Sequence, residues 1–373
     1  MLLDKLLVLA QSTGFASLSA GHIVMLAIGI GLIIIAITKE YEPLLLVPIG
    51  FGCILANLPN TGLLEGTGLL KILNFGLEYD LYPALVFLGV GAMIDFGPLL
   101  ANPSLMLLGA AGQIGIFSTF LIALGLGFNL KEAGSIGIIG AADGPTAIFM
   151  TQKLAPHLLG PVAVAAYSYM SLVPIIQPPI MKFLTTKQER SVVMRQWREV
   201  SKAERIAFPI IVTILTALAV PSAVPLTGTL MLGNLIREAA VVDRLSRTLQ
   251  EGFANIVSAL LGISVGATMQ ANIFLTKQTL GILALGLAAF IGGSAAGVLM
   301  GKVMYRVTGG KVNPLIGSAG ISAMPMAARV SHMMGRKENP NNFLIMHAMA
   351  ANVAGQLASP IAAAAVFTLI MGR

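Results

Sequence analysis

The stretch Ile138-Ile139-Gly140-Ala141-Ala142-Asp143-Gly144-Pro145-Thr146-Ala147-Ile148-Phe149 places a single carboxylate, that of Asp143, inside a long apolar run. Residues 133–142 before it and 144–152 after it carry no charge. Proline removes a backbone donor and glycine tolerates almost any backbone angle, so the Gly144-Pro145 pair predicts an interrupted helix. We therefore expect a helix broken at membrane depth, with freed carbonyls and one carboxylate at the break. Membrane proteins build sites for small cations in this way.

The composition places this break in a membrane protein. Of the 373 residues, 56% are hydrophobic and only 10% are charged, whereas a soluble domain carries about 25% charged residues. A spanning helix needs about 20 apolar residues. Uncharged runs of at least that length cover 6–38, 43–64, 96–130, 154–181, 206–236, 252–276, 278–301 and 339–372. With shorter pieces around 82–100, 133–152 and 312–328, we expect an all-α polytopic membrane protein of about ten or eleven membrane segments.

Charge divides the chain into regions. The segment 182–205 carries seven basic and three acidic residues, and the positive-inside rule predicts that this loop is cytoplasmic. It could also dock an acidic cytoplasmic partner, and the two interpretations are compatible. The net charge of +7 therefore need not indicate a nucleic-acid partner, and none is expected. We expect an interfacial segment at 1–20, a first membrane half at 21–181, the basic loop, and a second membrane half at 206–373.

The sequence of the second half resembles that of the first half at low identity. The run 316–322 (Ile-Gly-Ser-Ala-Gly-Ile-Ser) resembles 139–143 (Ile-Gly-Ala-Ala-Asp) at an offset of 177 residues. This pattern predicts two inverted repeats whose broken helices, at 138–149 and 313–329, meet near the membrane midplane, where substrates and coupling ions bind. The alternative is that glycine-rich membrane helices look alike by chance.

Asp143 is the main candidate site residue, because an ionisable group inside a membrane costs about 2.5–3.5 kcal/mol and is kept for function. A carboxylate at an interfacial helix end is the alternative. Sodium prefers hard oxygen ligands, and neutral oxygens lie in the two broken regions and the last apolar run. These candidates are Asn313, Ser322, Asn352 and Ser359. Each could instead make a helix–helix hydrogen bond.

Two further residues could bind an anionic group or assist the ion site. Arg329 ends the second broken segment and could anchor an anionic group, or it could extend its side chain to the membrane interface. Tyr169 could donate a proton or a hydrogen bond to the ion site, or it could belong to an aromatic belt. The four histidines show no metal-ligand spacing, and residues 297–303 do not form a phosphate-binding loop, so ATP is not the expected energy source.

Three motifs then resemble a known family, the β subunit of sodium-pumping biotin-dependent decarboxylases of the oxaloacetate, methylmalonyl-CoA and glutaconyl-CoA types. They are Gly140-Ala141-Ala142-Asp143-Gly144-Pro145-Thr146-Ala147-Ile148-Phe149, the run from Asn313 to Arg329, and Met346-His347-Ala348-Met349-Ala350-Ala351-Asn352-Val353-Ala354-Gly355. In that family a carboxyltransferase moves CO₂ to biotin on a separate carrier chain. The β subunit then decarboxylates carboxybiotin, takes up a proton and exports Na⁺.

The resemblance implies roles for matching residues. It places the family's ion-site aspartate on Asp143 and its functional asparagine and serine on Asn313 and Ser322, and further positions implicated in the family match Gly317, Asn352, Tyr169 and Arg329. We therefore expect Na⁺ binding at Asp143, Asn313, Gly317, Ser322 and Asn352. We expect catalytic roles for Asp143, Tyr169 and Arg329, with Arg329 also holding carboxybiotin. The implied partners are a carboxyltransferase α subunit, a biotin carrier subunit, a small membrane subunit, membrane lipid and further copies of the chain. The implied location is the inner (plasma) membrane.

Departures from the oxaloacetate-type pattern favour an acyl-CoA type. This chain has Ala350-Ala351 before Asn352 where those members resemble Gly-Pro, and they are longer before the Asp143 motif. From the residues alone, a Na⁺/H⁺ antiporter or a Na⁺-coupled secondary transporter is the main alternative, because a broken helix with an intramembrane acid serves a carrier equally well. A purely structural membrane anchor is a third.

Overall fold

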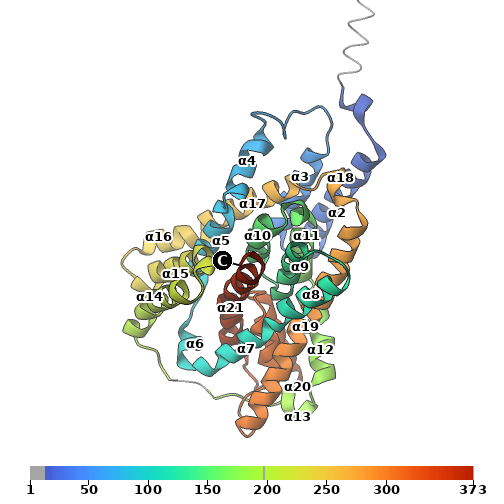
Figure 1. The fold of residues 1–373 in the computed structure, drawn as a ribbon. Coiled ribbons are helices and arrows are strands. Elements are labelled where there is room, and N and C mark those ends of the chain that lie inside the picture. The colour runs from blue at the N-terminus through green and yellow to red at the C-terminus, as the bar shows by residue number, and fades with distance from the viewer. Residues whose placement is uncertain (1–12, 196–197, 373) are drawn as a thin grey trace, which may run out of the picture.

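The computed structural model describes residues 13–195 and 198–372, and every regular element within them is helical, as the all-α prediction requires (Figure 1). The predicted interfacial segment 1–20 falls mostly outside the described residues. The elements of the first half are η1 (Gly14–Ser17), α2 (Ala20–Lys39), α3 (Pro43–Ala56), α4 (Leu69–Glu78), α5 (Leu81–Met93), α6 (Gly97–Ala101), η2 (Pro103–Leu105), α7 (Met106–Gly112), α8 (Ile114–Gly125), α9 (Leu130–Gly137), η3 (Ile138–Ala141), α10 (Gly144–Leu154), η4 (Pro156–Leu158), α11 (Leu159–Ser171) and α12 (Val173–Leu184).

The connector between the halves, residues 185–201, contains one short helix, and the second half consists mainly of longer helices. These elements are α13 (Lys187–Arg190), α14 (Lys202–Ala219), η5 (Pro221–Ala223), α15 (Val224–Ala239), α16 (Asp243–Thr248), η6 (Leu249–Phe253), α17 (Ala254–Ala267), α18 (Ala271–Phe274), α19 (Lys277–Val307), η7 (Pro314–Gly320), α20 (Met326–Glu338) and α21 (Ile345–Met371).

Five stretches are long and apolar enough to cross a membrane: Ala20–Lys39, Pro103–Gly125, Asp243–Ala267, Lys277–Val307 and Ile345–Met371. A sixth arises if Pro156–Ser171 and Val173–Leu184, which are bent by 65° relative to each other, form one span. The predicted ten or eleven segments are not confirmed by this measure. One reason is that uncharged runs are not always continuous helices: the run 206–236 is divided at Val220, just before Pro221, into α14 and α15.

The Asp143 stretch forms the turn of a helical hairpin. Helix α9 and the 3₁₀ turn η3 lead into the hairpin turn, where Ala142 takes a left-handed conformation with φ of 53°. The chain returns as α10. Near the open end of the hairpin, Glu132 Oε1 lies 3.1 Å from His157 Nε2. Because α9 begins and α10 ends close together, the segment enters and leaves on the same side of the fold.

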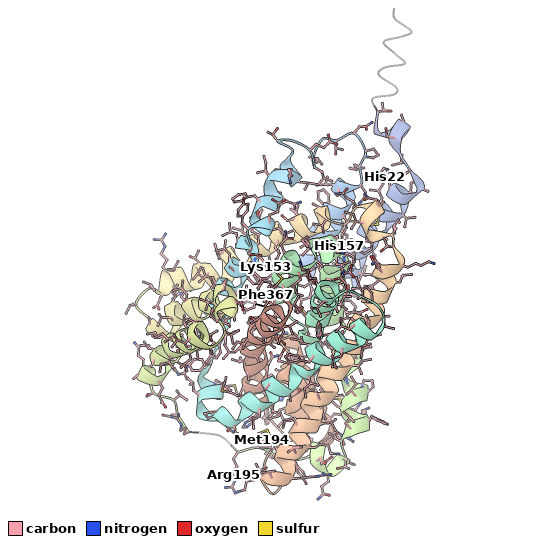
Figure 2. All side chains as sticks on the ribbon, in the orientation of Figure 1. His22, Lys153, His157, Met194, Arg195 and Phe367 are labelled. Carbon is pink, nitrogen blue, oxygen red and sulfur yellow. The ribbon has the colours of Figure 1, made fainter. Side chains whose placement is uncertain are left out.

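The second broken segment forms another hairpin, of η7 and α20. At its start Asn313 donates a hydrogen bond to the carbonyl of Arg190, and at its end Glu338 pairs with the Arg190 guanidinium at 2.9 Å. Both ends of this hairpin therefore lie beside the connector. Met194 and Arg195 of the connector lie at one end of the molecule, and Lys153 and His157 lie well away from it (Figure 2).

Glycines allow the second hairpin to approach its neighbours closely. A Cβ added to Gly317 of η7 would lie 2.0 Å from the carbonyl oxygen of Gly297 in α19, and one added to Gly297 would lie 2.1 Å from the carbonyl oxygen of Gly317. Only residues without a side chain fit at this crossing. The predicted site residue Gly317 thus positions the second hairpin against α19.

Candidate functional site

Asp143 is a buried carboxylate held only by neutral groups. It is 2% exposed and caps the N-terminus of α10, where its Oδ1 accepts from the Thr146 N–H at 3.2 Å. Its Oδ2 accepts from the Ser359 hydroxyl and, at 3.4 Å, from the Gln356 amide, both on α21. Within residues 13–195 and 198–372 no lysine, arginine or histidine pairs with it. A buried charge without a partner is costly, so this site needs a proton or a bound cation.

Helix α21 connects the two hairpins through one polar face. Asn352, Gln356 and Ser359 follow one another at spacings of four and three residues, which places them on the same side of the helix. Gln356 and Ser359 reach Asp143 of the first hairpin. Asn352 donates to the carbonyls of Ala319 at 3.1 Å and Ile321 at 2.7 Å in the second hairpin. One helix therefore contacts both breaks.

Ser322 also joins the two hairpins. Its backbone N–H donates to the carbonyl of Ala141 at 2.9 Å, and its hydroxyl donates to the carbonyl of Gly355 at 2.9 Å. The structure therefore brings Asp143, Ser322 and Asn352 together around α21, although they lie far apart in the sequence.

Side-chain amides satisfy the freed carbonyls of the second break and leave oxygens unpaired. Gln177 of α12 donates to the carbonyl of Ser318 at 2.8 Å, as Asn352 does to the carbonyls of Ala319 and Ile321. A carbonyl can only accept, so the nitrogen of each amide must face it. In the part of the chain that the structure describes, Asn352 Oδ1 and Gln177 Oε1 are buried and accept no hydrogen bond. Such oxygens can serve a hard cation.

The tyrosine that packs against the Asp143 break is Tyr167, two residues before the predicted one. Its ring covers Gly144, where an added Cβ would lie 2.1 Å from Tyr167 Cε1. The Tyr167 side chain is 1% exposed, and its hydroxyl finds no partner among the described residues. The Tyr169 hydroxyl instead donates to the carbonyl of Leu283 in α19.

Asn313 and Arg329 lie apart from this cluster in their contacts. The Asn313 side chain caps η7 and bonds to the carbonyls of Arg190 and Val192 in the connector. Arg329 is exposed in the first turn of α20, and its guanidinium makes no hydrogen bond or ion pair with the described residues. An exposed, unpaired guanidinium is free to receive an anionic group.

Comparison with known proteins shows the family of this chain. Residues 21–370 match the family described as the Na⁺-transporting oxaloacetate decarboxylase beta subunit. The chain belongs to this family. It is 54% identical over 363 residues to the glutaconyl-CoA decarboxylase subunit beta of Acidaminococcus fermentans, covering 97% of both chains. It is 54% identical over 360 residues to the methylmalonyl-CoA decarboxylase subunit beta of Veillonella parvula, covering 96% of both.

Oxaloacetate-type relatives are more distant. The probable oxaloacetate decarboxylase beta chain of Vibrio cholerae is 47% identical over 433 residues, covering 99% of this chain and all of the relative. This membership makes the chain a β subunit of the Na⁺-transporting decarboxylase class and a membrane protein, as the sequence motifs indicated. Sequence reasoning did not foresee Gln356 as a neighbour of Asp143. The signal that could have found it is the polar spacing of Asn352, Gln356 and Ser359 on one helix face.

Proposed function

We propose that this β subunit decarboxylates carboxybiotin carried by a partner chain and couples that reaction to Na⁺ export with proton uptake. The observation that carries the proposal is the buried Asp143 carboxylate, which meets only neutral donors at the junction of two re-entrant hairpins. Its charge has to be neutralised, and the two candidates, Na⁺ and H⁺, are the two ions that such a pump exchanges.

The proposed Na⁺ site is the space bordered by Asp143, Ser322, Asn352, Gln356 and Ser359. Asp143 supplies the charge, and Asn352 supplies an unpaired amide oxygen. The hydroxyls and Gln356 can rotate to present oxygen to the ion, because each has acceptor capacity besides the donor it now uses. Asn313 and Gly317, which the resemblance also assigns to Na⁺ binding, remain predictions on the family pattern.

The chemistry needs a carboxylate anchor and a proton donor. Decarboxylation breaks the N–CO₂ bond of carboxybiotin, releases CO₂ and leaves the electron pair on the biotin nitrogen, which then takes up a proton. Arg329 would hold the carboxylate before the bond breaks. The proton would come from the outer side through Asp143 or Tyr169, displacing Na⁺ as it arrives.

The arrangement of the two hairpins supports alternating access. Each enters and leaves on one side, and their turns meet at the bond between Ser322 and Ala141. We propose that they are inverted repeats and that motion of this paired unit exposes the ion site to each side in turn. The basic loop 182–205 would lie in the cytoplasm of a cell with the chain in its plasma membrane.

The proposed partners are a carboxyltransferase α subunit, a biotin carrier subunit and a small membrane subunit, together with further copies of this chain. The proposed acid substrate of the whole decarboxylase complex is of the acyl-CoA type. The glutaconyl-CoA and methylmalonyl-CoA relatives are 54% identical to this chain, against 47% for the Vibrio cholerae relative.

Reconstitution tests the proposal. The purified chain in proteoliposomes, supplied with carboxybiotin, should release CO₂ only when Na⁺ is present and should move sodium-22 at the same time. Sodium flux driven by a pH gradient, with carboxybiotin left intact, would instead establish the Na⁺/H⁺ antiporter or Na⁺-coupled transporter that the broken helices also allow.

A further inference from the structure

Gln113 is a polar residue near the middle of an apolar span. The stretch Pro103–Gly125 is long and apolar enough to cross a membrane, and Gln113 lies between α7 and α8, where the helix is interrupted. Residues 105–117 carry no other polar side chain. Polar groups at membrane depth are costly and mark ion or substrate pathways, and a helix–helix hydrogen bond is the alternative role. The contacts of Gln113 distinguish the two.

The span that carries Gln113 touches the turns of both hairpins. A Cβ added to Gly112 would lie 2.3 Å from the carbonyl oxygen of Gly320 in the second hairpin. A Cβ added to Gly140 in the first hairpin would lie 2.5 Å from the carbonyl oxygen of Gly115. Gln113 comes between Gly112 and Gly115 in the sequence. It therefore lies where the span passes the junction of the two hairpins.

The nitrogen of the Gln113 amide is fully used. Nε2 donates to the carbonyl of Gly109 in its own span at 3.1 Å and, at 3.5 Å, to the carbonyl of Gly355 in α21. The Gly355 carbonyl also accepts from the Ser322 hydroxyl at 2.9 Å. Gln113 and Ser322 thus meet at one oxygen atom, and Ser322 borders the proposed Na⁺ site.

The oxygen of the same amide is left without a donor. Both partners of Nε2 are carbonyls, which only accept, so the amide cannot be turned over and Oε1 faces away from them. The Gln113 side chain is 4% exposed, and among the described residues its Oε1 accepts no hydrogen bond. A helix–helix hydrogen bond explains the position of the nitrogen. It does not explain a buried oxygen that is left unpaired at a cost in stability.

We propose that Gln113 is a further ligand of the ion site and that the α7–α8 span contributes it through Oε1. A neutral amide oxygen adds coordination without adding charge, which suits a singly charged hard cation beside the one carboxylate of Asp143. The site then receives groups from both hairpins, from α21 and from this span. The assignment rests on the Na⁺ site of the proposed function and not on its decarboxylation step.

Thermal stabilisation by Na⁺ tests this assignment without any catalytic reaction, since an ion that binds the folded protein raises its melting temperature. The protein is the purified full-length chain in detergent. Gln113→Met keeps the length of the side chain and removes its amide. We expect this variant to need about tenfold more Na⁺ than the native chain for the same rise in melting temperature, because one ligand is lost. An unchanged Na⁺ requirement would overturn the assignment.

Asn57→Leu is the matched control for the loss of a buried amide. Asn57 is 2% exposed, and its Nδ2 donates to the carbonyls of Cys53 at 2.8 Å and Met269 at 2.7 Å. Its Oδ1 accepts from the N–H of Ala271 at 3.0 Å, so both amide atoms are bonded. Asn57→Leu should melt at a lower temperature without Na⁺ and keep the native Na⁺ requirement. A similar tenfold change in this variant would show that lost stability, and not a lost ligand, explains the effect at Gln113.

Gln113→Asn covers the case in which Gln113→Met does not fold. It keeps an amide in the span but withdraws its oxygen by one methylene group, so the Na⁺ requirement should rise in the same direction. A native requirement in Gln113→Asn would contradict the assignment.

Decarboxylation of carboxybiotin and movement of sodium-22 by the assembled complex are measured separately. If the complex pumps Na⁺ and both Gln113 variants keep the native Na⁺ requirement, the proposed function stands and the Gln113 ligand is refuted. If Na⁺ stabilises the native chain and the Gln113 variants weaken that effect, but carboxybiotin stays intact, the ligand stands and the proposed function is refuted. A native chain that Na⁺ does not stabilise would refute the ligand together with the ion site.

Discussion

The backbone N–H of Ser322 donates a hydrogen bond to the carbonyl of Ala141 at 2.9 Å, and this bond joins the turns of the two hairpins. Ala141 precedes Asp143 by two residues, so a shift of the second hairpin would act on the segment that carries the carboxylate of the proposed ion site. The Ser322 hydroxyl bonds in turn to Gly355 of α21, one residue before Gln356. Three segments therefore form the proposed site together: the two hairpins and α21.

Removing the hydroxyl of Ser359 should weaken the proposed Na⁺ site without destroying it. Asp143→Asn should abolish Na⁺-dependent decarboxylation, because the only charge of the site is lost. Ser359→Ala should raise the Na⁺ concentration for half-maximal rate about tenfold, since one donor to the same carboxylate oxygen disappears. The measurement is the rate of CO₂ release in proteoliposomes against Na⁺ concentration.

Ser118→Ala is the control for that series, because among the described residues the Ser118 hydroxyl bonds only to carbonyls of its own helix, at 2.7 Å for Ile114. It should leave the Na⁺ dependence unchanged. An Asp143→Asn variant that kept the native Na⁺ dependence would rule out Asp143 as the ion-binding residue.

Gly144 allows the Tyr167 ring to lie against the break, so Gly144→Ala should destabilise the protein. The new Cβ would lie 2.1 Å from Tyr167 Cε1 and 2.3 Å from Cζ, which predicts a loss of about 1–3 kcal/mol by overpacking. Tyr167→Leu should restore part of that stability in the double variant, whereas Tyr167→Phe should not, because the ring atoms remain. Thermal unfolding in detergent measures the effect, and equal behaviour of the two double variants would contradict this packing.

Gly317→Ala should be more damaging, because its new Cβ would meet backbone, at 2.0 Å from the carbonyl oxygen of Gly297. No rotamer change can relieve such a contact, so we expect a loss of about 3 kcal/mol or more and little folded protein. Gly292→Ala on the same helix α19 is the control. Its nearest atom, Ser118 Oγ, lies 3.9 Å away, and alanine favours a helix over glycine by up to about 1 kcal/mol. A normal melting temperature for Gly317→Ala would show that the hairpin does not touch α19 as described.

The ion pair between Lys153 and Asp80 should make stability depend on pH. The Nζ–Oδ2 distance is 2.6 Å, and it ties the end of α10 to the turn before α5. Burial raises the pKa of the Asp80 carboxyl, and Lys153 opposes that rise. Lys153→Met should therefore raise this pKa further, so that the folded state binds the proton more tightly than the unfolded state and loses stability as pH increases through the new pKa.

The deficit of Lys153→Met relative to the native protein should be about 1 kcal/mol near pH 7 and should shrink as pH falls, because protonation of the Asp80 carboxyl removes the ion pair from the native protein. Any part due to the lost contact of Lys153 with the Phe149 ring does not vary with pH. Thermal unfolding between pH 4 and 8 measures the change. Lys71→Met is the control, because the Lys71–Glu78 pair is 51% and 46% exposed. A deficit of the same size at every pH would count against the ion pair.

Sequence patterns located the breaks but not all of their contacts. Gly144-Pro145 after Asp143 predicted an interrupted helix, the internal similarity predicted a second one at 313–329, and the structure has a hairpin turn in each segment. The number of membrane segments was harder to predict, because an uncharged run does not reveal where proline or a bend divides it. The 65° bend between α11 and α12 is an example.

The sequence by itself determined that the chain is helical, membrane-embedded and built around an acid inside a long apolar run, because these features follow from composition and from the backbone chemistry of neighbouring residues. Only the tertiary structure decided which groups meet that acid. Gln356 and Ser359 lie 213 and 216 positions from Asp143, and Asn313 bonds to a connector more than 120 positions away. Such contacts are fixed by how the helices and hairpins pack, and no local pattern specifies them.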